Sequence, residues 1–379
     1  MCSPVWITGG QREFGGVYLR GLMLDGRRKS VEPMAARLGV PRQNLGHFVG
    51  QSTWDYTQLM RRVAARAVAD LTPSAWLIDD HPFVRYGRGT AGAAIQHCGE
   101  RGQHLCQVAV TVHAVSRRGS SPLHGRLFLP KTWAQDPGRC AKAGIPAGCG
   151  HRTKPQIALD LIDQLTACGL PPPPLVIADS DYGENVAFRT GLSARGIRWL
   201  MAVGGDTVVL PTIGHPTTAW ARRNPVHTVN TIAEANRYRA RRFIYRPRTA
   251  DHRARSGWFV AIRVHIAGVV ERTRVSKTIP GRLLPESTLL VQWRRKHDGD
   301  AFRVWITDLP ADTPLPVLVK HAASRWHIEC DYRQMEQALG LGDFEGRNWN
   351  GFHHHLALVA AAHPFCLEQR WNPKDQHTA

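Results

Sequence analysis

The chain has 379 residues, 43% of them hydrophobic, so it can bury one large core or the cores of two or three modest domains. Its formal net charge of +19 favours a polyanionic partner, with DNA or RNA ahead of an anionic membrane surface. No apolar stretch approaches the roughly 20 residues of a membrane helix, and the first residues lack the pattern of a secretory signal. We therefore expect a cytoplasmic protein with no membrane partner.

The eight cysteines are scattered, and none forms a Cys-x-x-Cys pair. In a chain without a secretory signal, they are expected to stay reduced. Cys140, Cys149 and His151 could supply part of a zinc site, although the sequence offers no obvious fourth ligand.

Residues 1–70 are predicted to form a helical N-terminal region. Apolar residues recur there at helical spacing, and Asp25-Gly26 and Gly39 mark turns between helices. The region is mainly basic, but we find no clean helix-turn-helix in it. A DNA-binding module and a packing domain therefore both remain open.

Residues 71–203 are predicted to form the first part of an α/β core. The runs AWLIDD and PLVIAD indicate buried strands that end in acids, and LCQVAVTVHAV has β composition. Thr153 and Gln156 match a capping box, so a helix is expected to begin there. Residues 204–309 carry short β runs with few helical stripes, which predicts a β-rich insertion.

Residues 310–379 are predicted to return to the core as helices. One helix is expected over residues 315–339, with Pro316 in its first turn and Gly340 after its end. Residues three, four and seven apart share a helix face. One polar stripe is thus predicted, made of Arg325, Glu329, Arg333 and Glu336. Such a stripe is usually a solvated face with ion pairs, and the alternative is an acidic ligand aimed at a metal and a phosphate.

Acidic residues fall at similar places in the predicted core. Asp79 and Asp80 end one strand, Asp179 ends another, and Glu329 lies on the late helix. In open α/β sheets, functional groups gather beyond the carboxyl ends of strands, and carboxylates suit Mg²⁺ or Mn²⁺. Two such ions about 4 Å apart can activate a nucleophile and stabilise the leaving oxygen of a phosphodiester. By spacing alone, the acids could also be caps or turn residues.

Three sequence blocks, taken together and in order, resemble a known family: WLIDDHPFVRYGRGTAG, VIADSDYGENVAFRTGL and RWHIECDYRQMEQALGLGDFEGRNWNGFHHHLAL. They resemble the cut-and-paste DDE transposases of bacterial insertion sequences, from about Tyr18 to Leu367. The resemblance implies an α/β fold: a ribonuclease-H-like catalytic core with a helical N-terminal region and a β-rich insertion before the last core helix.

The resemblance also implies roles for individual residues. Asp80, in preference to Asp79, would be catalytic together with Asp179 and Glu329, and these three would hold Mg²⁺ or Mn²⁺. Arg325 would hold a phosphate near the metal ions.

The third block departs from the family pattern at two positions. The tyrosine position holds Ala322 and the lysine position holds Glu336, so phosphate contacts would be rebuilt from Arg333 or Arg347. In the first block, His81 stands where relatives usually carry threonine.

Two further polar runs are candidates for DNA contact. Residues 237–255 hold eight arginines around three aromatic residues; arginine forks bind phosphate, and aromatic rings stack on unpaired bases. We favour DNA contact there over a solvated hairpin, through Arg239, Arg241, Arg242 and Arg246. The residues 353–355 are three histidines that point in different directions on a helix, so they cannot hold one ion together. Packing is expected for them, with at most one DNA contact.

These features together predict a transposase that cuts and joins double-stranded DNA at insertion-sequence ends by metal-dependent hydrolysis and strand transfer. It would act as a homodimer on transposon ends and target DNA, in the bacterial cytoplasm beside the nucleoid. One alternative is a truncated, inactive remnant that binds DNA without cutting it. Another is an acid-pair hydrolase such as a glycosidase, which the net charge of +19 disfavours.

Overall fold

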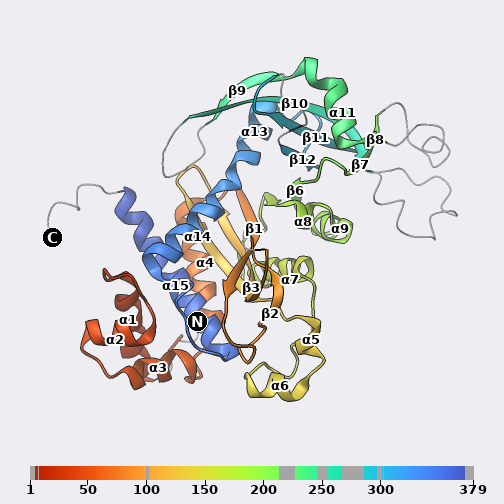
Figure 1. Ribbon diagram of the computed structural model, residues 1–379. Coiled ribbons are helices and arrows are strands. Elements are labelled where there is room, and N and C mark those ends of the chain that lie inside the picture. The colour runs from red at the N-terminus through yellow and green to blue at the C-terminus, as the bar shows by residue number, and fades with distance from the viewer. Residues whose placement is uncertain are drawn as a thin grey trace. The chain divides into compact units, whose positions relative to one another are not determined.

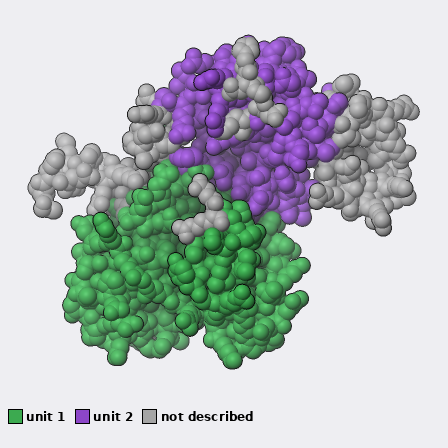
Figure 2. Space-filling view, viewed as in Figure 1, with its two compact units in different colours: residues 1–74, 78–172, 328–379 green, residues 75–77, 173–327 purple. Residues whose placement is uncertain are grey.

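The computed structural model describes residues 5–6, 8–99, 102–212, 227–245, 254–266, 286–296, 301 and 303–371. The chain divides into two compact units (Figure 2). Unit 1 comprises Met1–Ser74, Ile78–Pro172 and Ile328–Ala379, and unit 2 comprises Ala75–Leu77 and Pro173–His327. None of the described helices combines the length and the apolar character needed to cross a membrane.

Unit 1 begins with helices, drawn in red and orange in Figure 1: α1 (Gly9–Met23), α2 (Val31–Leu38), α3 (Arg42–Gly50) and α4 (Tyr56–Leu71). Local sequence explains their ends. Thr8 and Gln11 form a capping box at the start of α1, and the Asp55 carboxylate accepts the Thr57 N–H at the start of α4. Gly39 ends α2 in the left-handed conformation, at φ 65°.

The sheet of unit 1 has the strand order β2–β3–β1, and β4 pairs with β3. These strands are β1 (Ala75–Val84), β2 (Ala94–His97), β3 (Gln103–Val115) and β4 (Ser120–Leu127). After the short helices α5 (Lys131–Ala134) and α6 (Pro137–Lys142), α7 (Lys154–Ala167) packs on β3 and β4. Its predicted capping box of Thr153 and Gln156 is confirmed. Helices α4 and α15 (Trp349–Trp371) also pack on β4 and on each other.

Unit 2 begins from a parallel pair, β5 (Leu175–Ala178) and β6 (Arg198–Ala202), joined through α8 (Ser180–Gly183) and α9 (Val186–Ala194). Antiparallel strands extend this sheet in the order β12 (Arg303–Thr307), β11 (Glu286–Trp293), β10 (Arg255–Ile266), β7 (Val208–Pro211) and β8 (His227–Thr228). β9 (Arg241–Tyr245) pairs with β10. The predicted α/β fold class is confirmed.

One helix inside the β-rich stretch was not predicted. α11 (Val229–Asn236) precedes the 3₁₀ turn η2 (Arg237–Arg239). The Thr228 hydroxyl caps α11 by accepting the Thr231 N–H at 3.3 Å. β-Branched residues such as Val229 and Ile232 favour strands in isolation, so burial of these two side chains, rather than local propensity, accounts for the helix.

The predicted single helix over residues 315–339 is wrong in one respect. It is divided into α13 (Leu315–Ser324) and α14 (Trp326–Leu339), which meet at Arg325. The Ser324 hydroxyl donates to the Lys320 carbonyl at 2.9 Å, and such back-bonding weakens and bends helices. Gly340 follows α14 at φ 65°, as expected of the residue that closes it.

Candidate active site

The first acidic block lies inside a strand rather than at its end. β1 continues to Val84, four residues beyond Asp80, so the prediction that the acids end this strand is wrong. Successive side chains on a strand face opposite sides, and burial alternates accordingly. Asp79 and His81 are buried, whereas Asp80 between them is half-buried and faces the other way.

Asp80 is held against a lysine within unit 1. Its Oδ2 lies 2.5 Å from Nζ of Lys154, and the two side chains are 16% and 29% exposed. Lys154 is the first residue of α7, directly after the Thr153 cap, so the capping box sets the place from which its side chain extends. Partial burial reduces the screening of this ion pair relative to one at the surface. Asp80 is therefore a carboxylate in contact with a cation.

His81, on the opposite face of β1, contacts helix α14. Its Nε2 lies 3.2 Å from Oε1 of Glu336, and its ring lies 4.3 Å from that of Tyr332. Burial and, secondly, the negative charge of Asp79 raise the pKa of Tyr332 well above its usual value. Thus two of the three positions that depart from the family pattern, His81 and Glu336, contact each other.

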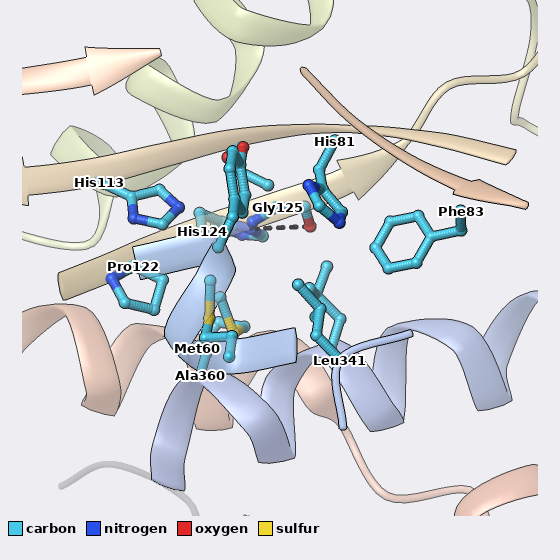
Figure 3. A pocket seen from close by; sticks show the side chains of 13 residues that line it. Met60, His81, Phe83, His113, Pro122, His124, Gly125, Leu341 and Ala360 are labelled. Carbon is cyan, nitrogen blue, oxygen red and sulfur yellow. Dashed lines mark hydrogen bonds between the residues drawn. The ribbon is translucent and has the colours of Figure 1, made fainter. Parts of the chain in front are cut away.

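A small cavity lies beside this contact (Figure 3). His81, His113 and His124 line it, together with apolar side chains such as Phe83 and Leu341. Its volume of about 10 Å³ has room for about one water molecule. This space is far too small for a nucleotide, so it belongs to the core and not to a substrate site.

Buried polar contacts anchor α14 next to Glu329. Asp331 is 3% exposed; its Oδ2 lies 2.8 Å from Nδ1 of His113, and its Oδ1 accepts the Ser120 hydroxyl at 2.6 Å. Burial raises the pKa of Asp331, but the His113 hydrogen bond and the charge of His363 outweigh burial and leave this pKa below its usual value. Glu329 itself is half-buried in the first turn of α14, where the helix dipole favours a carboxylate.

The second acidic block lies in unit 2. Asp179 follows β5 and caps α8, because its Oδ1 accepts the N–H groups of Asp181 and Tyr182 at 3.1 and 3.4 Å. Its Oδ2 lies 3.8 Å from the guanidinium of Arg325, so the structure brings two of the predicted site residues together. Gly183 is required after this cap, since a Cβ there would lie 1.9 Å from the Ala202 carbonyl oxygen.

The predicted DNA-contact residues that the structure describes are exposed, apart from the half-buried Arg325. Arg333 lies on α14, and Arg347 lies in the loop before α15. Arg239 ends η2, while Arg241 and Arg242 lie on β9. Arg246 lies outside the described residues.

The aromatic residues of the arginine-rich run differ in exposure. Tyr238 is 77% exposed, as a ring that stacks on a base must be. Phe243 and Tyr245 instead pack edge-on against Phe259 of β10. Of these three aromatic side chains, only that of Tyr238 is largely exposed.

The three histidines of α15 are buried and serve the fold. His355 accepts a hydrogen bond from the Tyr18 hydroxyl at 2.9 Å, and its Nε2 donates to the Gly340 carbonyl at 3.0 Å. Nε2 of His353 accepts the Leu127 N–H. The ring of His354 lies between the carbonyls of Val49 and Trp54, of which a neutral imidazole can satisfy one. Packing is confirmed, but side chains only 1–2% exposed leave no group for the DNA contact considered from sequence.

The metal-binding predictions differ in outcome. Within the described part of the chain, no three His, Cys, Asp or Glu side chains lie close enough together to hold one metal ion. Cys140 contacts the Trp133 carbonyl and His151 the Leu129 carbonyl, so they contribute to the fold rather than to a zinc site. The carboxylates of Asp80 and Asp179 each lie close to a cationic side chain, and carboxylate oxygens are the ligands that Mg²⁺ and Mn²⁺ prefer.

Lys154, which contacts the predicted site residue Asp80, was not singled out from the sequence. The helix start at Thr153 was recognised, but nothing in the local pattern links that start to β1, which lies 74 residues earlier at Asp80. The sequence signal that could have indicated this contact is a lysine directly after the N-cap of a helix that packs on the core sheet.

Two family models match the chain. The model described as "DDE superfamily endonuclease" matches residues 8–251, and "Transposase DDE domain" matches residues 145–364. A similar curated protein is a probable transposase for insertion sequence element IS701 from Microchaete diplosiphon. It is 32% identical over 194 residues, 50% of this chain and 48% of that protein, so the chain spans about half the length of the curated relative it matches. Because each family match extends over more than half of the chain, the protein belongs to the DDE superfamily endonucleases, with a transposase DDE domain.

Proposed function

We propose that this chain cuts and joins double-stranded DNA at the ends of an insertion sequence, with Asp80, Asp179 and Glu329 as its catalytic carboxylates. The family matches support the class of reaction. The observation that carries the proposal is the pairing of two of these carboxylates with cationic side chains: Asp80 with Lys154 in unit 1, and Asp179 with Arg325 in unit 2. Carboxylate oxygens are the ligands that Mg²⁺ and Mn²⁺ prefer.

The three carboxylates would hold Mg²⁺ or Mn²⁺. A bound ion of this type activates water and stabilises the leaving oxygen of a phosphodiester. Lys154 has a flexible four-carbon stem, so its ammonium group can move from Asp80 to a DNA phosphate. Arg325 offers a planar fork that suits a phosphate oxygen pair. We further propose, as the sequence predicts, that the protein works as a homodimer on DNA in the bacterial cytoplasm.

A nicking assay on a plasmid that carries the flanking element ends tests the proposal. Asp80→Asn, Asp179→Asn and Glu329→Gln should each lower Mg²⁺-dependent nicking by about a thousandfold, as expected when a preorganised charge is removed from a reaction centre. DNA affinity should change only a few-fold. Asp160→Asn is the matched control, because Asp160 pairs with Arg126 and Arg152 on a surface of α7.

Asp79→Asn decides between the two acids of β1. Full activity of Asp80→Asn together with loss of activity in Asp79→Asn would show that the wrong acid was assigned. If all three catalytic variants nick like the parent protein, the active-site proposal is rejected.

The second candidate is a DNA-binding remnant that does not cut. Glu336, at a position where the family usually has lysine, contacts His81 at 3.2 Å, and this departure favours the remnant. Specific binding of the element ends without metal-dependent nicking by the parent protein would support it.

A further inference from the structure

The short helix that begins after Asp179 cannot hold its own direction. α8 has only four residues, and an isolated helix of this length is unstable in water. It packs against α9 and β6, and Figure 1 shows these two elements beside it. The direction of α8 is therefore set by its contacts with other parts of unit 2.

The orientation of the Asp179 carboxylate depends on α8. Its Oδ1 accepts the N–H groups of Asp181 and Tyr182, so the carboxylate is tied to the first turn of the helix. Its Oδ2 lies 3.8 Å from the guanidinium of Arg325. A rotation or an unwinding of α8 would therefore move both oxygens of this carboxylate.

The other end of α8 is held by backbone packing and by one side chain. Gly183 lies so close to β6 that a Cβ would stand 1.9 Å from the Ala202 carbonyl oxygen. The Gly183 carbonyl accepts a hydrogen bond from the guanidinium of Arg189 on α9. Because the last carbonyls of a helix have no partner within it, Arg189 supplies a missing donor from a neighbouring element.

Arg189 is buried, with 6% of its surface exposed. Arginine is almost never fully buried unless it is paired. Burial lowers the pKa of Arg189 to about 10, and the charge of Glu184 offsets only part of this effect. The apolar neighbours Phe188 and Leu192 already pack this face of α9. A cation buried beside them points to a specific role rather than to packing alone.

α9 presents Arg189 from a well-fixed position. Asn185 caps α9, because its side-chain oxygen accepts the Phe188 N–H at 2.9 Å. The Phe188 ring packs against that of Tyr182 on α8, with 5.3 Å between the ring centroids, and both side chains are 1% exposed. The two helices thus share an aromatic contact and the hydrogen bond from Arg189, which holds the end of α8 opposite to Asp179.

We propose that Arg189 is a positioning residue for DNA cleavage: by holding the Gly183 carbonyl, it fixes α8 and thereby the direction of the Asp179 carboxylate. This inference rests on the proposed function in taking Asp179 as a catalytic carboxylate. Arg189 acts through α8 rather than by contact with DNA. Its planar guanidinium offers several N–H donors in fixed directions. Lysine keeps a charged donor, whereas methionine has none.

Hydrogen–deuterium exchange of the full chain without DNA tests whether Arg189 holds α8. In Arg189→Met, the amides of residues 181–184 should exchange about tenfold faster than in the parent protein, because loss of a buried hydrogen bond lets α8 open. The amides of β5 and β12 should change by less than about twofold, since the opening is local. Arg189→Lys should bring exchange back to within about threefold of the parent, because an ammonium group still donates.

The matched control for exchange is Arg195→Met. Arg195 ends α9 and also donates to a backbone carbonyl, that of Gly191 at 2.8 Å, but its side chain is exposed. Exchange at residues 181–184 should be the same in this variant as in the parent protein.

Nicking kinetics test whether holding α8 matters for the reaction. In Arg189→Met, kcat for Mg²⁺-dependent nicking should fall about a hundredfold, as expected when a reacting group is misplaced. KM for the duplex should stay within about threefold, because no DNA contact is removed. Arg189→Lys should recover most of kcat, and Arg195→Met should keep all of it.

The two measurements separate the possible failures. Unchanged exchange at residues 181–184 in Arg189→Met, or equally faster exchange throughout the chain, would assign Arg189 to general stability and overturn the proposal. Faster exchange at residues 181–184 with nicking at the parental rate would also overturn it. Parental nicking by Asp179→Asn would instead reject the catalytic role of Asp179 in the proposed function, whatever the exchange result.

Discussion

Two polar regions of this protein differ in how far their side chains are exposed to solvent. The buried polar network of unit 1 comprises His124, the histidines at 353–355 and Asp331 with its partners His113 and Ser120. The exposed arginine segment of unit 2 comprises Arg239 at the end of η2 and Arg241 and Arg242 of β9. In the first region, polar atoms bond to the chain itself. In the second, the guanidinium groups face solvent. Burial, and not residue type, separates a polar group that stabilises the fold from one that can bind a ligand.

The largest expected effect is acid destabilisation through the buried histidines. Burial lowers the pKa of His353 to about 3 and those of His124 and His355 to about 4. The unfolded chain binds protons near pH 6.5, but these folded sites stay neutral, so stability is complete above pH 6.5 and falls as the pH drops toward 4. The loss should be about 1.4 kcal/mol per pH unit for each histidine, measured as urea unfolding free energy from pH 7.5 to 5.0.

Histidine variants locate the source of this pH dependence. His353→Gln should reduce the slope of the unfolding free energy against pH by the contribution of one histidine. His104→Gln, at an exposed position on β3, should leave it unchanged. A stability that stays constant from pH 7.5 to 5.0 would contradict the assignment of these histidines to the buried region.

The next largest effect should come from Asp331→Asn. Asparagine keeps one acceptor oxygen but replaces the other with an NH2 donor, so one of the two buried partners loses its acceptor. Breaking a buried pair costs about 3 kcal/mol. The free energy of unfolding at pH 7.5 measures the loss. Asp160→Asn, which breaks the partly exposed pairs with Arg126 and Arg152, should cost no more than about 1 kcal/mol. Equal losses in the two variants would mean that burial does not distinguish these regions.

The arginine segment should show the opposite behaviour, with DNA binding altered and folding stability unchanged. Changing Arg239, Arg241 and Arg242 together to alanine should weaken binding to all duplex sequences. Each lost phosphate contact should reduce the slope of log affinity against log salt by about one. A control variant removes the same charge from exposed positions of α4, at Arg61, Arg62 and Arg66. If both variants and the parent protein show the same salt slope, these arginines face solvent and do not contact DNA.

The smallest effect is expected at the His81–Glu336 contact, which joins a buried side chain to an exposed one. His81 is buried, but the Glu336 side chain is 49% exposed. Glu336→Lys should lower the unfolding free energy by less than about 1 kcal/mol, since the lost pair is largely solvated. It should raise DNA affinity and nicking a few-fold, because a repulsive charge becomes attractive. The DNA affinity and nicking rate of Glu336→Gln should lie between those of the lysine variant and the parent protein. Unchanged or weaker DNA binding by Glu336→Lys would show that position 336 does not approach DNA.

Local patterns in the sequence were sufficient to predict several elements of the fold. The capping box at Thr153, the closure of α14 at Gly340 and the β runs of the insertion depend on neighbours within a few residues. The roles of Asp80, Asp179 and Glu329 were inferred from a resemblance and remain predictions. The helix α11 was missed, because its β-branched residues favour strands in isolation.

Pairing across long separations was decided only by the tertiary structure. Tyr18 bonds to His355 across 337 residues, and His113 bonds to Asp331 across 218. Lys154 reaches Asp80 on a strand that the sequence predicted to end at that acid. Periodicity indicates which face of a helix or strand is apolar, but it does not specify which distant polar group lies opposite. The composition alone established a basic, foldable chain, whereas the packing of α14 and α15 determined which of its histidines and carboxylates are withdrawn from solvent.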